Sequence, residues 1–142
     1  MRHAYPLNLE RDEDGRVVAH IPDLPGAHTD GADEAEALTE AEDCLIAALT
    51  GCMRAGEPIP EPSPARDRPT VAVPPLVAAK LALYDALRAE GVSPAALAKR
   101  LGVTEIAVRR LLDLDHRSHL DGIEAALRAL GRRLEIGVRR AA

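Results

Sequence analysis

The chain has 142 residues and a formal net charge of -5. That length is enough for one medium-sized domain or two small domains with modest hydrophobic cores. No apolar run approaches the ~20 residues of a membrane-spanning helix, and residues 1–10 lack the charged and apolar regions of a secretory signal peptide. These features argue against a membrane or secreted protein, and we expect a cytoplasmic one.

The charge is divided unevenly along the chain. Residues 1–68 hold 6 Arg and no Lys against 15 acidic residues, a net charge of -9, whereas residues 69–142 hold 12 basic against 8 acidic residues, a net charge of +4. Basic clusters favour nucleic acids and acidic surfaces favour basic proteins, so this division indicates two partners of opposite charge. Charge that only keeps both halves soluble is the alternative, and the count alone leaves it equally open.

The beginning of the chain predicts a small antiparallel sheet. Apolar residues alternate with others over residues 5–10 and 17–21, which is the period of strands with one buried face. Residues 12–15 (Asp-Glu-Asp-Gly) form a turn sequence between them, because Asp tolerates turn geometry and Gly supplies a positive φ. Residues 22–26 (Pro-Asp-Leu-Pro-Gly) then predict a rigid loop that leads into a short third strand at residues 27–29.

A long amphipathic helix is expected from Asp33 to about Ala55. Asp33 can cap its first turn, apolar residues recur at spacings of three and four, and Gly56 supplies a natural stop. The prolines of residues 57–69 predict an extended connector, which ends in a short strand at residues 70–73. The first domain is therefore expected to span residues 1–73, and the second residues 74–142.

No catalytic constellation, metal site or cofactor site is expected in this half. The acidic candidates suit turn and loop chemistry, and the histidines lack the spacing of metal ligands; these candidates are Asp12, Asp14, Asp23, His3, His20 and His28. Cys44 and Cys52 are eight residues apart in the predicted helix, so about 12 Å of helix separates them. That distance exceeds the reach of a disulfide, and we expect two free thiols.

Several segments of this half, taken in order, resemble the N-terminal domain of HicB antitoxins. They are Asp14-Gly15, Ile21-Pro22-Asp23-Leu24-Pro25-Gly26, Thr29-Asp30-Gly31 and Gly56-Glu57-Pro58-Ile59-Pro60-Glu61-Pro62-Ser63. Ala27 stands where this family commonly has cysteine. The resemblance implies a degenerate ribonuclease H-like fold, an antiparallel sheet with one long helix, that has no nuclease activity. It also implies a partner, a small mRNA-cleaving toxin of the HicA type whose active site this domain covers.

The second half is predicted to be helical. Pro75 is well placed to begin a helix that Gly91 ends. Ser93 and Thr104 can each cap a short helix, and Gly102 supplies the tight turn between the two. This arrangement resembles the helix-turn-helix of Cro and phage-repressor proteins, with an ordinary helical hairpin as the alternative.

The same resemblance makes residues 105–112 a recognition helix in the major groove of DNA. Arg109 can then donate to guanine, Glu105 can accept from cytosine, and Ile106 can contact a thymine methyl group. Thr104 is the fourth candidate for base contacts. Phosphate contacts need only a positive charge or a helix N-terminus, and the candidates for them are Ser93, Lys99, Arg110 and Arg117. His116 and His119 lack the companion ligands that a metal site needs.

The end of the chain predicts one more helix and a strand. Ser118, with Asp121 three residues later, can cap a helix that ends at Gly131. Residues 132–138 then alternate apolar and other side chains, which predicts a strand that has no partner in a helical domain. Pairing with its copy in a second subunit would cover the exposed edge and place two recognition helices ~34 Å apart. We therefore expect a homodimer or a higher oligomer.

The sequence as a whole predicts an α+β protein, a ribonuclease H-like HicB domain followed by a helix-turn-helix domain with a C-terminal strand. The corresponding function is an antitoxin that is not an enzyme, inhibits a HicA-type toxin and binds operator DNA to regulate its own operon. One alternative is a stand-alone helix-turn-helix regulator whose N-terminal half senses a ligand or mediates oligomerisation. Another is an RNA-processing enzyme that uses the ribonuclease H-like half.

Overall fold

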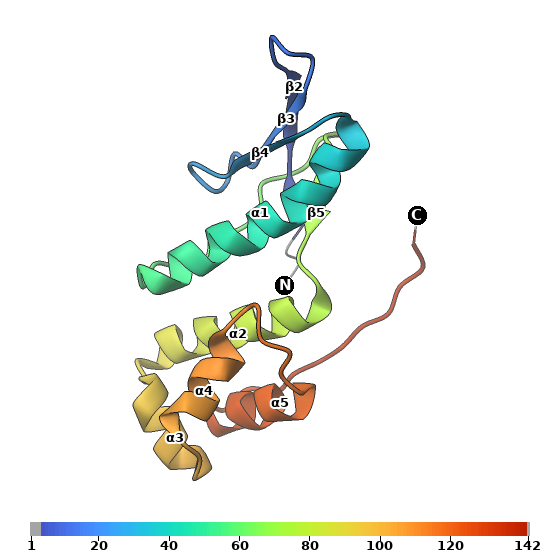
Figure 1. Ribbon diagram of the computed structural model, residues 1–142. Helices are drawn as coiled ribbons and strands as arrows, with labels where there is room; N and C mark the ends of the chain where they lie inside the picture. The colour runs from blue at the N-terminus through green and yellow to red at the C-terminus, as the bar shows by residue number, and fades with distance from the viewer. Residues whose placement is uncertain (1–3, 142) are drawn as a thin grey trace. The chain divides into compact units, whose positions relative to one another are not determined.

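The computed structural model of the chain describes residues 4–141. The chain divides after Ala78 into two compact units, and each is described here by itself. Figure 1 shows the strands in the first unit, whereas the second contains helices and an extended C-terminal segment. Antiparallel strands and helices are thus both present, and the predicted mixture of α and β structure is confirmed.

A three-stranded antiparallel sheet is formed by β2 (Asn8–Arg11), β3 (Val17–His20) and β4 (His28–Gly31), with β3 in the middle. The predicted hairpin turn joins the first two strands. In it, one carboxylate oxygen of Asp12 accepts from the backbone N–H of Asp14 at 3.0 Å and from that of Arg16 at 2.9 Å.

A second sheet pairs β1 (Ala4–Pro6) with β5 (Thr70–Ala72) in antiparallel register. The single strand predicted over residues 5–10 is therefore wrong, because β1 and β2 belong to different sheets. The chain passes between them at Leu7, whose N–H donates to the carbonyl of Pro69 at 2.8 Å. Alternation continues through such a change of partner, so the sequence pattern did not reveal it.

Helix α1 (Glu34–Arg54) confirms the predicted long helix and its cap. The carboxylate of Asp33 accepts from the N–H of Glu36 at 2.8 Å. Its fully buried side chains recur every four residues, at Ala37, Ala41, Leu45 and Leu49. The helix lies close to β4, because a Cβ built on Gly31 would approach the backbone nitrogen of Ala37 to 2.4 Å.

The proline-rich connector is held against the first unit by side chains. The hydroxyl of Tyr5 donates to the carbonyl of Pro60 at 2.7 Å. The carboxylate of Asp23 accepts from both the N–H and the hydroxyl of Ser63. These contacts give Asp23 a structural role in addition to its place in the Pro-Asp loop.

The helices of the second half are α2 (Pro75–Glu90), α3 (Pro94–Leu101), α4 (Glu105–Leu112) and α5 (Leu120–Ala129). The predicted caps of the two short helices are confirmed, since Ser93 accepts from the N–H of Ala96 and Thr104 from that of Ala107, both at 3.1 Å. Gly102 adopts φ +67 in the turn between them. The core of this unit contains the fully buried side chains Leu81, Leu83, Leu97, Val108 and Ile123.

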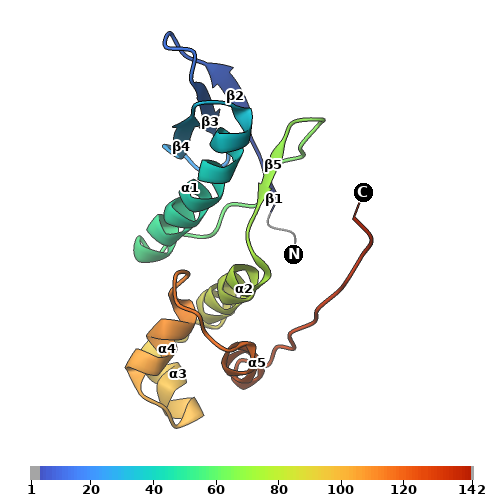
Figure 2. The ribbon, with the colours of Figure 1, turned by 45° about the vertical axis from the view of Figure 1, so that its right-hand side comes forward.

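One prediction for the end of the chain is wrong, and another stays a prediction. Ser118 does not cap α5, because its hydroxyl has other partners. His119 occupies the cap position and forms no side-chain cap hydrogen bond. Residues 132–138 pair with no other segment of residues 4–141, so the strand that was expected to pair with its copy in a second subunit stays a prediction. Figure 2 shows this segment leading away from α5, and Val138 is 97% exposed.

Candidate functional site

The surface of α3, α4 and the loop that follows contains all eight residues predicted to bind DNA. Each of them is exposed, and they are Ser93, Lys99, Thr104, Glu105, Ile106, Arg109, Arg110 and Arg117. Ser93 and Thr104 also serve as helix caps. Ile106 is 65% exposed, which is unusual for a large apolar side chain on a helix whose opposite face is buried through Val108.

Two of these candidate residues, Glu105 and Arg109, form an ion pair with each other. The guanidinium of Arg109 donates to one carboxylate oxygen of Glu105 through Nη2 at 2.6 Å and through Nε at 3.1 Å. The two residues are one helical turn apart, so they lie on the same face of α4. The exposed face of this helix therefore carries a cation and an anion side by side.

The sequence analysis missed a buried lysine beneath this surface. Lys80 on α2 is fully buried, and its ammonium group donates to the carbonyl oxygen of Arg110 at 2.8 Å and to the hydroxyl oxygen of Ser118 at 2.7 Å. Burial lowers the pKa of Lys80, and the nearby charge of Asp113 partly opposes that effect. The only sequence signal was a lysine within the apolar stripe of a helix, between Val77 and Leu83.

Ser118 connects this lysine to the loop between α4 and α5. Its hydroxyl lies 3.2 Å from the carbonyl oxygen of Arg110 and 3.0 Å from Nδ1 of His116. The carbonyl of Arg110 is among the last four of α4, which lack the usual partner four residues later in a helix, and it also accepts from the N–H of Asp113 at 3.3 Å. Lys80 on α2 and Ser118 in the following loop therefore both hold the C-terminal end of α4 through this carbonyl oxygen.

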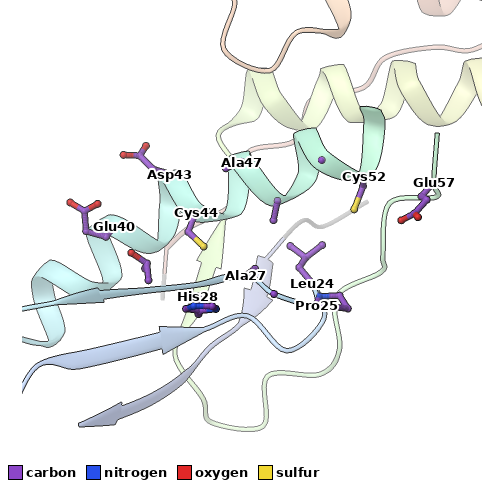
Figure 3. A pocket seen from close by; sticks show the side chains of 14 residues that line it. Leu24, Pro25, Ala27, His28, Glu40, Asp43, Cys44, Ala47, Cys52 and Glu57 are labelled. Atoms are coloured by element: carbon purple, nitrogen blue, oxygen red, sulfur yellow. The ribbon is translucent and has the colours of Figure 1, made fainter. Parts of the chain in front are cut away.

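The first unit carries a groove between α1 and the segment from Leu24 to Thr29. It has a volume of about 740 Å³. Figure 3 shows the sulfur atoms of Cys44 and Cys52 pointing from α1 toward this segment, with the carboxylates of Glu40 and Asp43 at the outer side of the helix. Burial raises the pKa of both thiols, so they stay uncharged at neutral pH.

Among residues 4–141 no group of three or more His, Cys, Asp or Glu side chains could hold a metal ion. Both cysteines are free, as predicted, and His3 lies outside the described residues. No helix in the described part of the chain has the length and apolar character needed to cross a membrane.

Comparisons with known proteins agree with the resemblance seen in the motifs. Residues 4–82 match the model of a family described as HicB_like antitoxin of bacterial toxin-antitoxin system. Antitoxin HicB 2 of Photorhabdus laumondii is 37% identical and aligns with 93% of this chain and 94% of its own length. Antitoxin HicB of Escherichia coli K12 is 32% identical over 93% of this chain and 96% of its own length. Antitoxin HicB of Pseudomonas fluorescens is 36% identical over 94% of this chain and 92% of its own length.

Matches of this extent define the class of protein, which is the antitoxin component of a bacterial toxin-antitoxin system. Within that class, the chain belongs to the HicB-like antitoxin family. The family model covers the first unit and the beginning of α2, whereas the relatives align with nearly the whole chain.

Proposed function

We propose that the chain inhibits a HicA-type toxin through its N-terminal unit and represses its own operon by binding operator DNA through α3 and α4. The supporting observation is its likeness, along nearly its full length, to relatives that are named as HicB antitoxins. A toxin that cleaves RNA needs a cationic surface for its substrate. The net charge of -9 over residues 1–68 suits a partner of that kind.

The N-terminal unit would act by binding and not by catalysis. We propose that its sheet and long helix are a degenerate ribonuclease H-like fold. Two of the carboxylates considered as metal ligands have structural roles, since Asp12 orders the hairpin turn and Asp23 holds the connector at Ser63. This use of the acidic residues supports a protein that blocks an active site without having one.

The second unit would place α4 in the major groove of DNA. In support, α3 and α4 are two short helices joined at a glycine in a left-handed conformation, which is typical of a helix-turn-helix. The exposed positions 105, 106 and 109 on α4 would contact base edges. The basic residues Lys99, Arg110 and Arg117 would contact phosphates.

A dimer would present two such helices to a palindromic operator. We propose that residues 132–138 pair with the same segment of a second chain. The exposed apolar side chains of Ile136 and Val138, which are 73% and 97% exposed, support this proposal. So does the absence of a strand partner for them within the described chain, because an unpaired apolar strand tends to add another strand.

Co-purification tests the proposed function. The tagged chain and the untagged small gene next to it are expressed together, and the eluate is assayed for the neighbouring protein and for binding to the operon's own promoter fragment. We expect a stable complex that binds the promoter and has no RNA-cleaving activity. Promoter binding without any retained partner would instead favour a stand-alone regulator.

A further inference from the structure

The groove of the first unit combines an uncharged floor with an acidic rim. Its floor is formed by small residues from the two segments that enclose it, Ala27 on the loop and Ala47, Ala48 and Gly51 on α1. Three carboxylates belong to the same lining, Glu40, Asp43 and Glu57, and no Lys or Arg does. A surface of this kind can take a chain segment close to its backbone while attracting positive charge.

The carboxylates of α1 are available for such a segment. Glu40 and Asp43 are exposed, and no ion pair found among residues 4–141 includes either of them. They are three residues apart and therefore lie on one face of the helix. Cys44 and Ala47 continue that face toward the floor, next to the face that α1 buries against the sheet.

The side chains of Lys and Arg fit both parts of this lining. Each has an apolar stem that can cover an apolar surface and a charged head that remains at the solvent boundary. The stems would lie on the alanines and the protonated thiols, and the heads would reach the carboxylates of the rim. An acidic or a purely apolar segment would satisfy only one of these two requirements.

We propose that this groove is the docking site for a basic segment of the toxin, with the positive heads of that segment bound to Glu40 and Asp43. The inference rests on the proposed function, because it takes the toxin as the partner and names the face that receives it. It accounts for the position of the groove on the acidic unit and for the lack of any Lys or Arg in its lining.

The first test changes charge at the rim. The full-length chain and the purified toxin are titrated against each other by calorimetry, and Asp43→Arg is compared with Glu42→Arg. Glu42 is an exposed neighbour on the same helix that does not line the groove. We expect Asp43→Arg to weaken binding by about tenfold or more, because it places like charges together. The control is expected to weaken binding by less than about threefold.

The second test fills the groove. A Cβ on Gly51 meets no atom within 4 Å, and Gly51→Leu should be accepted by the helix because Leu has a much higher helix propensity than Gly. Its side chain would occupy the floor and weaken toxin binding by about a hundredfold. Ala35→Leu adds the same side chain to an exposed position of α1 outside the groove, and we expect it to bind like the wild type.

The outcomes separate this inference from the proposed function. A wild-type chain that does not bind the toxin overturns both. Wild-type binding that survives Asp43→Arg and Gly51→Leu overturns the docking site alone, as does an equal loss in Asp43→Arg and Glu42→Arg. Circular dichroism and thermal unfolding confirm that each variant is folded before its affinity is interpreted.

Discussion

Arg109 and Glu105 illustrate how one ion pair can prepare a side chain for another partner. Their contact on α4 is 2.6 Å long, but both groups are largely exposed to solvent, and exposed pairs at this spacing contribute only about 0.3–0.5 kcal/mol. The pair limits the conformations of the guanidinium and can still open when a better acceptor arrives. A base edge in the proposed operator complex would be such an acceptor.

Arg109→Ala is therefore expected to weaken operator binding by ~1 to 3 kcal/mol, because a group that can bond a base edge is lost. Inhibition of the toxin should stay unchanged. Arg128→Ala is the matched control, since it removes a pair of the same spacing, with Glu124, from α5. Mobility-shift and toxin-inhibition assays measure the two activities. Loss of both in Arg109→Ala would contradict the assignment of one partner to each unit.

Lys80 makes the free energy of unfolding depend on alkaline pH. Burial lowers its pKa below the ordinary value of 10.5, so between the lowered value and 10.5 the unfolded chain binds more protons than the folded chain. The free energy of unfolding contributed by this group therefore rises with pH across that window. This contribution of Lys80 to the free energy of unfolding is complete above pH 10.5, and it is lost as the pH falls through the lowered pKa.

The comparison with Lys80→Met isolates this effect. Cys44 and Cys52 have raised pKa values and so contribute the opposite slope above 9.0, but they are the same in both proteins. We expect the stability of the wild type relative to Lys80→Met to increase with pH, as measured by urea unfolding at a series of alkaline pH values. Parallel curves for the two proteins would show that the buried amine does not titrate differently in the folded state.

At the scale of elements, the contact of β4 with α1 depends on one missing side chain. Gly31→Ala would place a Cβ 2.4 Å from the backbone of Ala37, and neither the strand nor the helix can move without disturbing the core. We expect a loss of about 1–3 kcal/mol in the free energy of unfolding. Gly51→Ala is the control in the same helix, where the added methyl group meets nothing. It should stabilise the protein by about 0.5–1 kcal/mol, and chemical denaturation measures both changes.

The elements that could be predicted are those with local causes. Caps at Asp33, Ser93 and Thr104 need only a side-chain oxygen and an N–H two or three residues later, and all three are present. The length of α1 also followed from its own sequence. The eight residues proposed to contact DNA were placed by a resemblance and by their chemistry. The structure adds that they are exposed and that Glu105 and Arg109 form an ion pair.

What could not be predicted depends on distant segments. The division between β1 and β2 is imposed by β5, which is more than sixty residues away in the chain. Ser118 has the right residue type for a cap, but Lys80 and the carbonyl of Arg110 hold its hydroxyl instead. The groove also needs two segments to meet, so its lining cannot be read from either one alone.

At the scale of the whole molecule, the extended C-terminal segment leads to a test of assembly. Ile136→Asp places a charge within the proposed intermolecular strand pair, and we expect it to convert the dimer into a monomer and to weaken operator binding, since one recognition helix alone reads half a palindrome. Glu135→Asp, on the other face of the segment, should leave the assembly intact. Analytical ultracentrifugation measures the mass of each. A wild-type monomer at micromolar concentration would rule out this route to dimerisation.

The hydrogen bonds that hold α4 have a consequence for how the proposed DNA-binding surface could change its target over evolutionary time. Lys80 and Ser118 hold the helix through the carbonyl oxygen of Arg110, an atom that every amino acid supplies. The side chains at positions 109 and 110 can therefore be exchanged without loosening the anchor beneath them. If α4 contacts the operator as proposed, new operator preferences can then arise by substitution on its exposed face, while the contacts that position the helix are inherited unchanged.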